Sequence, residues 1–340
     1  MQVNQALIIQ TAFIGDVILT TPLIENLHEH YPEAFIDVLV NQDTASLLHN
    51  HPKVRHVYAW NKKKRKYAAL LALVKTVRRN RYDLLINCHR FASSGLVAAG
   101  SGAKLRVGFR KNPFSFTYDV SVSHTFAAGT HEVDRNLSLL TASVVRKPPE
   151  KLRRRPQLYP TAADRQCVRT YQQQPYVCVA PTSVWFTKQL PAAQWSKLID
   201  ALPAETLVYL LGSKQDAEHC AQLQRSTHRP VVNLAGKLSL LQSAELMRGA
   251  VINYVNDSAP LHLASATNAP VCAVYCSTVP RFGFYPLSDA SWTVEVAEPL
   301  SCRPCGLHGH AACPEGHFRC ARDITTQQLL HSYHQALARV

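Results

Sequence analysis

The sequence predicts an α/β protein built from two doubly wound, Rossmann-like domains that face each other across a cleft. Its 340 residues exceed the length over which a single hydrophobic core usually grows, which favours two domains. Hydrophobic residues make up 46% of the chain and charged residues 18%, a balance typical of globular proteins. Short apolar runs alternate with helical patterns in both halves, as expected for parallel sheets covered by helices.

In the first half, short apolar runs indicate buried strands at Leu7–Gln10, Phe35–Val40, Asp83–Cys88 and Lys104–Phe109. Apolar side chains at helical spacing predict helices from Gly15–Asp16 to His30, over Thr44–Asn50, from the basic run Lys62–Lys66 to Val77, and over His131–Val145. A proline-rich, basic stretch at Arg146–Pro160 follows, and proline lacks a backbone donor. We therefore place a domain boundary after residue 155, between an N-terminal domain, 1–155, and a C-terminal domain, 156–340.

The second half repeats the alternation. Strands are expected at Tyr176–Ala180, Thr206–Leu211, Val231–Asn233, Ala250–Val255 and Val271–Tyr275. Helices are expected at Ala192–Leu202, Lys214–Gln224, Leu240–Met247 and Ser258–Ala266. The pattern leaves the final helix, Thr325–Ala338, without a definite domain, and packing back on the N-terminal domain is one of its options.

The formal net charge of +14 indicates an anionic partner: nucleic acid, an acidic lipid surface or a phosphorylated substrate. The alternative is a basic surface that serves solubility. We expect a cytoplasmic protein, because the N-terminus lacks the positive region of a signal peptide and no apolar run approaches the ~20 residues of a membrane span. The ten cysteines are too sparse for a disulfide scaffold and are expected to be reduced.

Two familiar phosphate-binding signatures are incomplete. After Gly100 and Gly102, a dinucleotide fingerprint would need a glycine where Leu105 stands. The spacing of Gly95 and Gly100 suits a P-loop, but Ser101 occupies the lysine position. Hydride transfer on a nicotinamide and P-loop ATP chemistry are therefore disfavoured.

Two later stretches have the chemistry of an anion site. In Ala180–Leu190, an apolar strand stops at Pro181 and two hydroxyls and a lysine follow. In Tyr254–Leu263, another strand ends at a run of small polar residues and a helix begins. A helix N-terminus and unpaired backbone amides favour an anion, so the second half is predicted to hold a nucleotide diphosphate. Asp16, at an earlier strand-to-helix junction, either complements its helix dipole or acts as a general base.

Three motifs carry a family resemblance: FIGDVILTTPLIENL with Asp16, the pair Thr182–Ser183 with Lys188 and Pro191, and NDSAPLHLA with Asp257 and His262. Over nearly the whole chain, the sequence resembles the ADP-heptose:lipopolysaccharide heptosyltransferase family, glycosyltransferase family 9. The resemblance implies two Rossmann-like domains in the GT-B arrangement and an inverting transfer. It also implies that domain 1–155 binds the acceptor and domain 156–340 binds the nucleotide sugar. It further implies that neither a cofactor nor a catalytic metal is needed.

By position, the resemblance implies that Asp16 is the catalytic base. It assigns donor binding to Thr182, Ser183, Lys188, Asp257, Ser258, Ala259 and His262. Ala259 replaces the family's usual glycine, which leaves close approach of the backbone to a phosphate open. Leu241 stands where some members carry a glutamate toward the donor, which leaves the donor's identity open. His262 either bonds a phosphate or caps the core side of its helix.

In this family a comparable basic stretch lies beside the acceptor cleft, so the resemblance implies acceptor binding by the run after Trp60, which contains Lys62, Lys63, Lys64 and Arg65. His131 and Arg135 are expected to face the same cleft. These cations would attract the acidic sugars and phosphates of a lipid-linked saccharide. The alternative for the basic run is a solvated start of a helix.

A cysteine-rich segment near the C-terminus allows a second interpretation. Its candidate metal ligands are Cys302, Cys305, Cys313 and Cys320, with His308, His310 and His317 between them. Their spacing would suit a structural zinc, although it is not that of a standard finger. The alternative, which we adopt, is a reduced and partly buried loop without a metal.

Together, these features predict a glycosyltransferase peripheral on the inner face of the cytoplasmic membrane. It would move a heptose or related sugar from an ADP-sugar to a lipopolysaccharide core or similar acidic glycolipid. A transferase of the same fold with another nucleotide sugar, and a sugar-binding relative without activity, remain alternatives. A zinc-containing nucleic-acid-binding protein would leave Asp16 and the Thr182–Lys188 stretch unexplained, so no nucleic-acid partner is expected.

Overall fold

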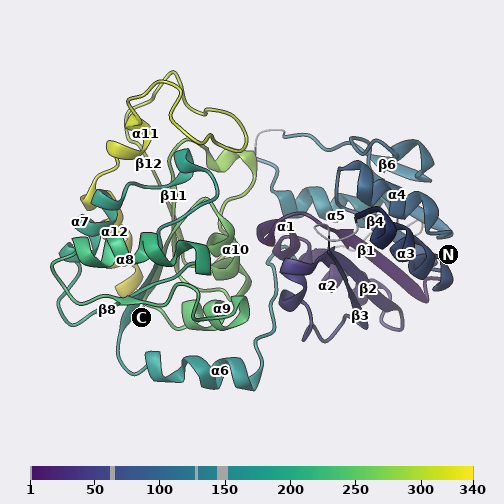
Figure 1. Ribbon diagram of the computed structural model, residues 1–340, viewed down its shortest axis with the longest axis horizontal. Coiled ribbons are helices and arrows are strands. Elements are labelled where there is room, and N and C mark those ends of the chain that lie inside the picture. The colour runs from purple at the N-terminus through teal and green to yellow at the C-terminus, as the bar shows by residue number, and fades with distance from the viewer. Residues whose placement is uncertain (1, 62–65, 127–128, 144–151, 340) are drawn as a thin grey trace. The chain divides into compact units, whose positions relative to one another are not determined.

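The structure is a computed structural model that describes residues 2–61, 66–126, 129–143 and 152–339. The chain divides into two compact units, Met1–Tyr159 and Pro160–Val340 (Figure 1). This division lies four residues after the boundary expected at residue 155. None of the helices in the described ranges is long and apolar enough to cross a lipid bilayer.

The N-terminal unit contains a six-stranded sheet in the order β3-β2-β1-β4-β5-β6, with every neighbouring pair parallel. Its strands are β1 (Gln5–Gln10), β2 (Phe35–Asn41), β3 (His56–Trp60), β4 (Leu84–Asn87), β5 (Leu105–Phe109) and β6 (Val120–Val122). Its helices are α1 (Ile14–Ile18), α2 (Thr21–His30), α3 (Lys66–Arg79), α4 (Ala92–Gly100) and α5 (Glu132–Ser143). In place of the short helix expected at Thr44–Asn50, a 3-10 helix spans Gln42–Leu47.

The C-terminal unit has a second six-stranded parallel sheet, in the order β12-β11-β10-β7-β8-β9. Its strands are β7 (Tyr176–Ala180), β8 (Leu207–Leu210), β9 (Val232–Asn233), β10 (Ile252–Asn256), β11 (Val271–Tyr275) and β12 (Ser291–Glu295). Its helices are α6 (Ala162–Val168), α7 (Ala192–Ala201), α8 (Ala217–Ser226), α9 (Leu240–Arg248), α10 (Ala259–Ala266), α11 (Arg319–Arg322) and α12 (Thr326–Leu337). The final helix, α12, packs against α7 and β12 of this unit.

Both sheets have the same topology. Read from the opposite edge, the second sheet runs β9-β8-β7-β10-β11-β12 and so repeats the order of the first. The direction of chain winding reverses between β1 and β4 in one unit and between β7 and β10 in the other. Open parallel sheets bind ligands outside the carboxyl ends of their strands at such switch points. Each unit therefore has one preferred place for a ligand.

The central strands are buried because helices cover both faces of each sheet. All five residues of β7, β10 and β11 are buried, as are the last five of β1. In the C-terminal unit, the largest fully buried side chains include Trp195 of α7 and Tyr254 of β10. The Tyr254 hydroxyl donates to the carbonyl of Leu329 at 2.8 Å, which attaches α12 to the core.

The single helix expected from Gly15–Asp16 to His30 is two helices, α1 and α2. Pro22 at the start of α2 has no N–H and cannot bond the carbonyl of Ile18 as a continuous helix requires. The Thr21 hydroxyl donates to that carbonyl instead, at 2.8 Å. The break leaves α1 as a short, separate turn directly after β1.

Candidate functional site

Asp16 lies in α1, just beyond the carboxyl end of β1 and therefore at the switch point of the N-terminal sheet. One oxygen of its carboxylate accepts a hydrogen bond from the Phe13 backbone N–H at 3.2 Å, which fixes it at the start of the helix. The loop after β4 lies beside this turn, because the Thr11 hydroxyl and the His89 ring nitrogen Nδ1 are 3.0 Å apart. Asp16 thus occupies the place in this unit where the topology predicts a ligand.

The electrostatic environment makes Asp16 a better proton acceptor than an ordinary aspartate. Burial, and next the negative charge of Glu132, raise the pKa of Asp16 from 3.8 to about 6, although the Phe13 N–H and Arg90 act in the opposite direction. A carboxyl group with this pKa is ionised at neutral pH and still has useful basicity. The site therefore suits a general base.

Glu132, at the start of α5, is a buried anion held by two partners. Its Oε2 accepts from Arg135 Nε at 2.6 Å, and its Oε1 lies 3.2 Å from His124 Nε2. Burial alone would raise the pKa of Glu132, but His124 and Arg135 lower it, so the carboxylate stays charged. This arrangement keeps a fixed negative charge beside Asp16.

We expect Glu132→Gln to move the acid limb of the pH profile of kcat/KM to lower pH. The amide removes the charge that helps to raise the pKa of Asp16, so Asp16 loses its proton at lower pH. The measurement is kcat/KM from pH 4 to 8, with a melting curve to verify folding. Glu33→Gln, which changes an exposed carboxylate of the same unit, is the control and should leave the limb in place. An unmoved limb in folded Glu132→Gln would contradict the assignment.

The predicted acceptor residues have different surroundings. Arg135 is 4% exposed, pairs with Glu132 and donates from Nη1 to the Thr130 carbonyl at 2.7 Å. His131 is fully buried, and its ring nitrogen Nδ1 accepts from the Val133 N–H at 3.1 Å. Both residues shape the region around Glu132, and their contact with an acceptor stays a prediction. Lys62, Lys63, Lys64 and Arg65 lie outside the described residues.

Sequence reasoning missed three cations at the carboxyl edge of this sheet. Arg90 follows β4 and is half-buried, whereas Arg110 and Lys111 follow β5 and are exposed. Arg90 and Lys111 lie 5.8 and 5.7 Å from the centre of the Phe126 ring. The signal that could have found them is their position immediately after predicted strands, where parallel sheets place functional side chains.

In the C-terminal unit, the two stretches with predicted donor residues lie together. Thr182 and Ser183 follow β7, and Asp257 and Ser258 follow β10, on the two sides of the switch point. Asn256 joins the stretches: its amide donates to the Pro181 carbonyl at 2.8 Å and accepts from the Leu190 N–H at 2.9 Å. The Ser258 hydroxyl donates to the Thr182 carbonyl at 3.4 Å.

Lys188 and Asp257 form a nearly buried ion pair at this switch point. Lys188 Nζ lies 2.7 Å from Asp257 Oδ2, and the two side chains are 15% and 9% exposed. The Thr278 hydroxyl donates to the same carboxylate oxygen at 2.7 Å. The pair fixes a cation beside the first turn of α10, where the first backbone N–H groups of a helix have no intrahelical acceptor. A cation and helical N–H groups together suit an anionic ligand.

The remaining predicted donor residues are on α10. Ser258 is its N-cap and Ala259 its first residue, and Pro260 follows. His262 lies one turn further, is 5% exposed, and has its ring centre 6.4 Å from that of Phe284. Its burial agrees with a residue that packs under the first turn of the helix.

The cysteine-rich segment supports the loop that carries Lys188. Thr187 and His310 exchange two bonds, from Thr187 N to the His310 carbonyl at 3.1 Å and from His310 N to the Thr187 hydroxyl at 2.7 Å. The Cys305 N–H donates to the Ser277 carbonyl at 3.1 Å. All ten cysteines are free, and within the described ranges no three His, Cys, Asp or Glu side chains are placed to hold a metal ion.

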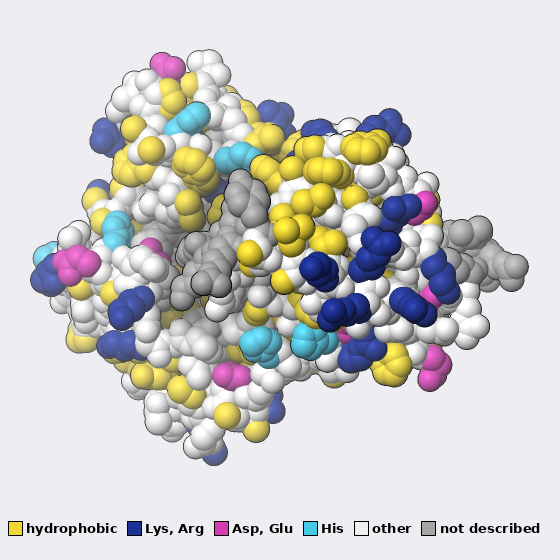
Figure 2. All heavy atoms as spheres, turned by 45° about the vertical axis from the view of Figure 1, so that its right-hand side comes forward, with side chains coloured by type: hydrophobic (Ala, Val, Ile, Leu, Met, Phe, Trp, Pro, Cys, Tyr) yellow, Lys and Arg dark blue, Asp and Glu magenta, His cyan; other side chains and the backbone are white. Residues whose placement is uncertain are grey.

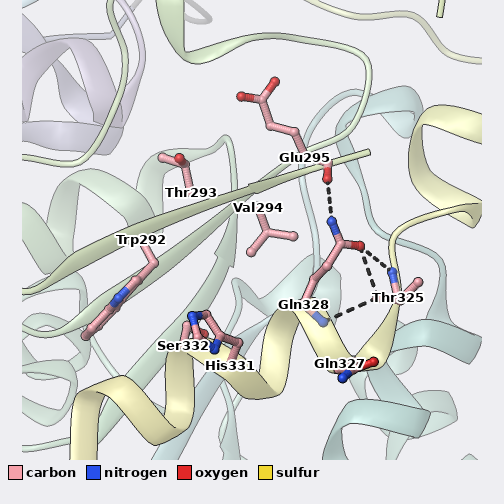
Figure 3. A pocket seen from close by; sticks show the side chains of 9 residues that line it. All are labelled: Trp292, Thr293, Val294, Glu295, Thr325, Gln327, Gln328, His331 and Ser332. Atoms are coloured by element: carbon pink, nitrogen blue, oxygen red, sulfur yellow. Dashed lines mark hydrogen bonds between the residues drawn. The ribbon is translucent and has the colours of Figure 1, made fainter. Parts of the chain in front are cut away.

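One pocket, with a volume of about 530 Å³, lies between β12 and α12 (Figure 3). Gln328 spans it, because its amide donates to the Glu295 carbonyl at 3.0 Å and accepts from the Thr325 N–H at 2.9 Å. None of the predicted donor residues lines this pocket. Those residues lie instead beside the switch point of the C-terminal sheet.

Comparison with solved structures defines the class of fold. The chain matches the structure of E. coli ADP-heptose LPS heptosyltransferase II with a TM-score of 0.82 and 23% identity, over 98% of this chain and 99% of that one. It matches E. coli heptosyltransferase WaaC with ADP with a TM-score of 0.74 and 19% identity, over 98% and 99%. The fold is therefore the GT-B fold of two Rossmann-like domains, as expected.

Sequence comparison adds the family. The profile of glycosyltransferase family 9 (heptosyltransferase) matches residues 70–310, and lipopolysaccharide heptosyltransferase 3 of E. coli is 31% identical over 285 residues, 78% of this chain and 82% of that protein. The chain belongs to glycosyltransferase family 9, and it is a glycosyltransferase of the heptosyltransferase type. The family resemblance seen in the three sequence motifs is confirmed.

Proposed function

We propose that this enzyme transfers a heptose, or a closely related sugar, from an ADP-sugar to a lipopolysaccharide-type acceptor with inversion at the anomeric carbon. One observation carries the proposal: the predicted site residues follow the central strands at both switch points, with Asp16 after β1 and the Lys188–Asp257 pair beside β7 and β10. The names of its relatives, which include lipopolysaccharide heptosyltransferases and a heptosyltransferase solved with ADP, supply the substrate classes.

In this mechanism, Asp16 takes the proton of an acceptor hydroxyl. The hydroxyl oxygen attacks the anomeric carbon of the donor from the side opposite the diphosphate, and the bond from that carbon to the phosphate oxygen breaks. Inversion follows from the single displacement, and ADP leaves with its electron pair. Lys188, the hydroxyls of Thr182 and Ser183, and the N-terminus of α10 stabilise the negative charge on the departing diphosphate.

Asp257 acts through Lys188 in this proposal. A carboxylate directly against a diphosphate would repel it, but Asp257 is already bonded to Lys188 and Thr278. We therefore assign to Asp257 the positioning of the lysine. The backbone of Ser258 and Ala259, at the start of α10, would contact the phosphates, and His262 would support that turn.

The acceptor would bind the N-terminal unit and the donor the C-terminal unit. The basic residues Lys62 to Arg65, with the cations after β4 and β5, would attract the acidic groups of a lipid-linked saccharide. Because such an acceptor is anchored in a bilayer, we propose that the enzyme works peripherally at the inner face of the cytoplasmic membrane. Neither a nucleic acid nor a cofactor has a role in this scheme.

A nucleotide panel tests the donor. We expect ADP and ADP-heptose to raise the melting temperature, because a ligand that binds the native state stabilises it. UDP and GDP should have little effect at the same concentration, because the proposed donor is an ADP-sugar. ADP-heptose and a deacylated lipopolysaccharide core should then give a product heavier by one heptose, with inverted anomeric configuration by NMR.

A specific alternative is another nucleotide sugar on the same scaffold. It is favoured by Leu241, a buried apolar residue of α9 where some family members carry a glutamate toward the donor. A larger melting shift with UDP or GDP than with ADP would support this alternative and reject the adenine nucleotide.

A further inference from the structure

The carboxyl edge of the N-terminal sheet carries an unusual group of exposed aromatic side chains. Phe91, before α4, is 66% exposed, Phe116 is 81% exposed, and Leu96 of α4 is 38% exposed. Phe114 is half-buried and stacks on Phe116 with ring centres 6.0 Å apart. We call the set Phe91, Leu96, Phe114 and Phe116, with Arg90, Arg110 and Lys111, the aromatic–basic rim.

Hydrogen bonds hold the two parts of the rim together. The buried Asn112 donates to the carbonyls of His89 and Phe91 at 2.9 and 3.0 Å, and accepts from the Phe114 N–H at 2.9 Å. A Cβ on Gly95 of α4 would lie 2.1 Å from the Asn112 side-chain oxygen, so the loop and the helix are in close contact. The exposed rings are therefore presented by a fixed framework.

The charge of the rim favours an anionic partner. Arg110 and Lys111 are exposed beside the aromatic side chains, and the whole chain carries a net charge of +14. Figure 2 shows hydrophobic side chains gathered on one face of the N-terminal unit, next to several Lys and Arg side chains. Aromatic rings that enter the interface, with cations that meet anionic head groups, are the features of a surface that lies on a bilayer.

The shape of the rim favours a bilayer over a folded protein partner. Phe91 and Phe116 are each more than 60% exposed, and Phe116 stays so although Phe114 stacks on it. A lipid interface accepts such highly exposed rings without further shape matching, whereas a protein partner needs a complementary surface around them.

The rim is connected to the region of Asp16 by two contacts. The Thr11 hydroxyl is 3.0 Å from the His89 ring, and the His89 and Phe91 ring centres are 4.9 Å apart. Asp16 and the rim thus lie on the same edge of the N-terminal sheet. We propose that the aromatic–basic rim docks the enzyme on an anionic lipid bilayer and so brings this edge to the head groups, where a lipid-linked acceptor presents its sugars. The second part of this inference rests on the proposed function.

Sedimentation with lipid vesicles tests the docking directly. The full chain should bind phosphatidylethanolamine vesicles that contain phosphatidylglycerol, and bind weakly to vesicles of a neutral lipid alone. Phe91→Ser with Phe116→Ser should lower the partition coefficient by about tenfold or more, because two apolar side chains leave the interface. Arg110→Glu with Lys111→Glu should lower binding to the anionic vesicles and reduce its salt dependence.

Matched controls come from the opposite, amino-terminal edge of the same sheet. Phe35→Ser changes a 56% exposed phenylalanine at the start of β2, and Arg78→Glu with Arg79→Glu reverses two exposed charges at the end of α3. Both controls should bind vesicles like the unaltered chain. Absence of vesicle binding by the unaltered chain, or equal losses in rim and control variants, would overturn the proposal.

Two acceptors separate this inference from the proposed function. The Phe91→Ser, Phe116→Ser variant should lose transfer to a lipid-anchored acceptor in vesicles and keep transfer to the deacylated, water-soluble acceptor. Equal loss on both acceptors would show that the rim serves catalysis and not docking. If the unaltered chain binds vesicles but transfers heptose to neither acceptor, the proposed function is wrong. The inference that the aromatic–basic rim docks on a bilayer would not be affected.

Discussion

Asp16→Asn is expected to lower kcat by about 10²–10⁴-fold while the affinity for ADP stays nearly unchanged. Asparagine has almost the same shape and retains an oxygen for the Phe13 N–H, but it cannot take a proton. Because the donor diphosphate is assigned to the other unit, its binding should not depend on this carboxylate. Steady-state kinetics and calorimetry with ADP measure the two quantities separately. Unchanged turnover would remove Asp16 from the mechanism.

The same substitution should stabilise the fold at neutral pH. The pKa of Asp16 is raised from 3.8 to about 6, so the folded chain binds this proton more tightly than the unfolded chain. The preference of the folded chain for protonated Asp16 therefore contributes fully to the free energy of unfolding below pH 4. This contribution is lost as the pH rises to about 6. Above pH 6 the ionised carboxylate costs on the order of 1–3 kcal/mol, which asparagine avoids.

Melting curves check this stability difference. Asp16→Asn should melt above the unaltered chain at pH 7, and the difference should shrink toward pH 4. Glu33→Gln, an exposed carboxylate of the same unit, should show no such trend. If Asp16→Asn lost its activity but melted below the unaltered chain at pH 7, the loss of activity would be explained by a damaged structure. Asp16 would then have a structural role and not a catalytic one.

Lys188→Ala is expected to weaken ADP binding by about tenfold or more and to destabilise the C-terminal unit by about 3 kcal/mol. The loss of binding follows from the missing cation beside the diphosphate. The loss of stability follows because the carboxyl group of Asp257, which is 9% exposed, is left without its cationic partner. Calorimetry with ADP and urea unfolding measure the two effects.

A second substitution separates these two effects. Lys188→Ala with Asp257→Asn removes the unpaired charge, so most of the stability should return while ADP binding stays weak. Lys197→Ala removes an exposed lysine of α7 and is the control for both measurements. Recovery of ADP binding in the double variant would show that Lys188 acts only on the fold.

The sequence predicts the central strands far better than the edges of the sheets. Tyr176–Ala180 and Val271–Tyr275 are predicted to the residue, because a strand buried on both faces is a continuous apolar run. Three of the four edge strands, β3, β6 and β12, were missed. Most of their residues are half-buried or exposed, so they show neither a long apolar run nor strict alternation.

The candidate site shows a similar limit. The positions of Asp16 and of the two donor stretches follow from motifs placed directly after predicted strands. The Lys188–Asp257 pair and the charge of Glu132 beside Asp16 join residues that are far apart in the sequence. No local pattern encodes such pairings, because they arise only when the parallel strands bring their carboxyl ends together.

The repeated strand order has an evolutionary consequence. Each half has its own sheet and its own winding reversal, and a proline-rich segment separates the halves along the chain. The buried core clusters of the two halves share no residue, so a core substitution in one half removes no side chain from the core of the other. If one half binds the acceptor and the other the donor, as proposed, descendants of such a chain can change their acceptor while they keep the same nucleotide sugar.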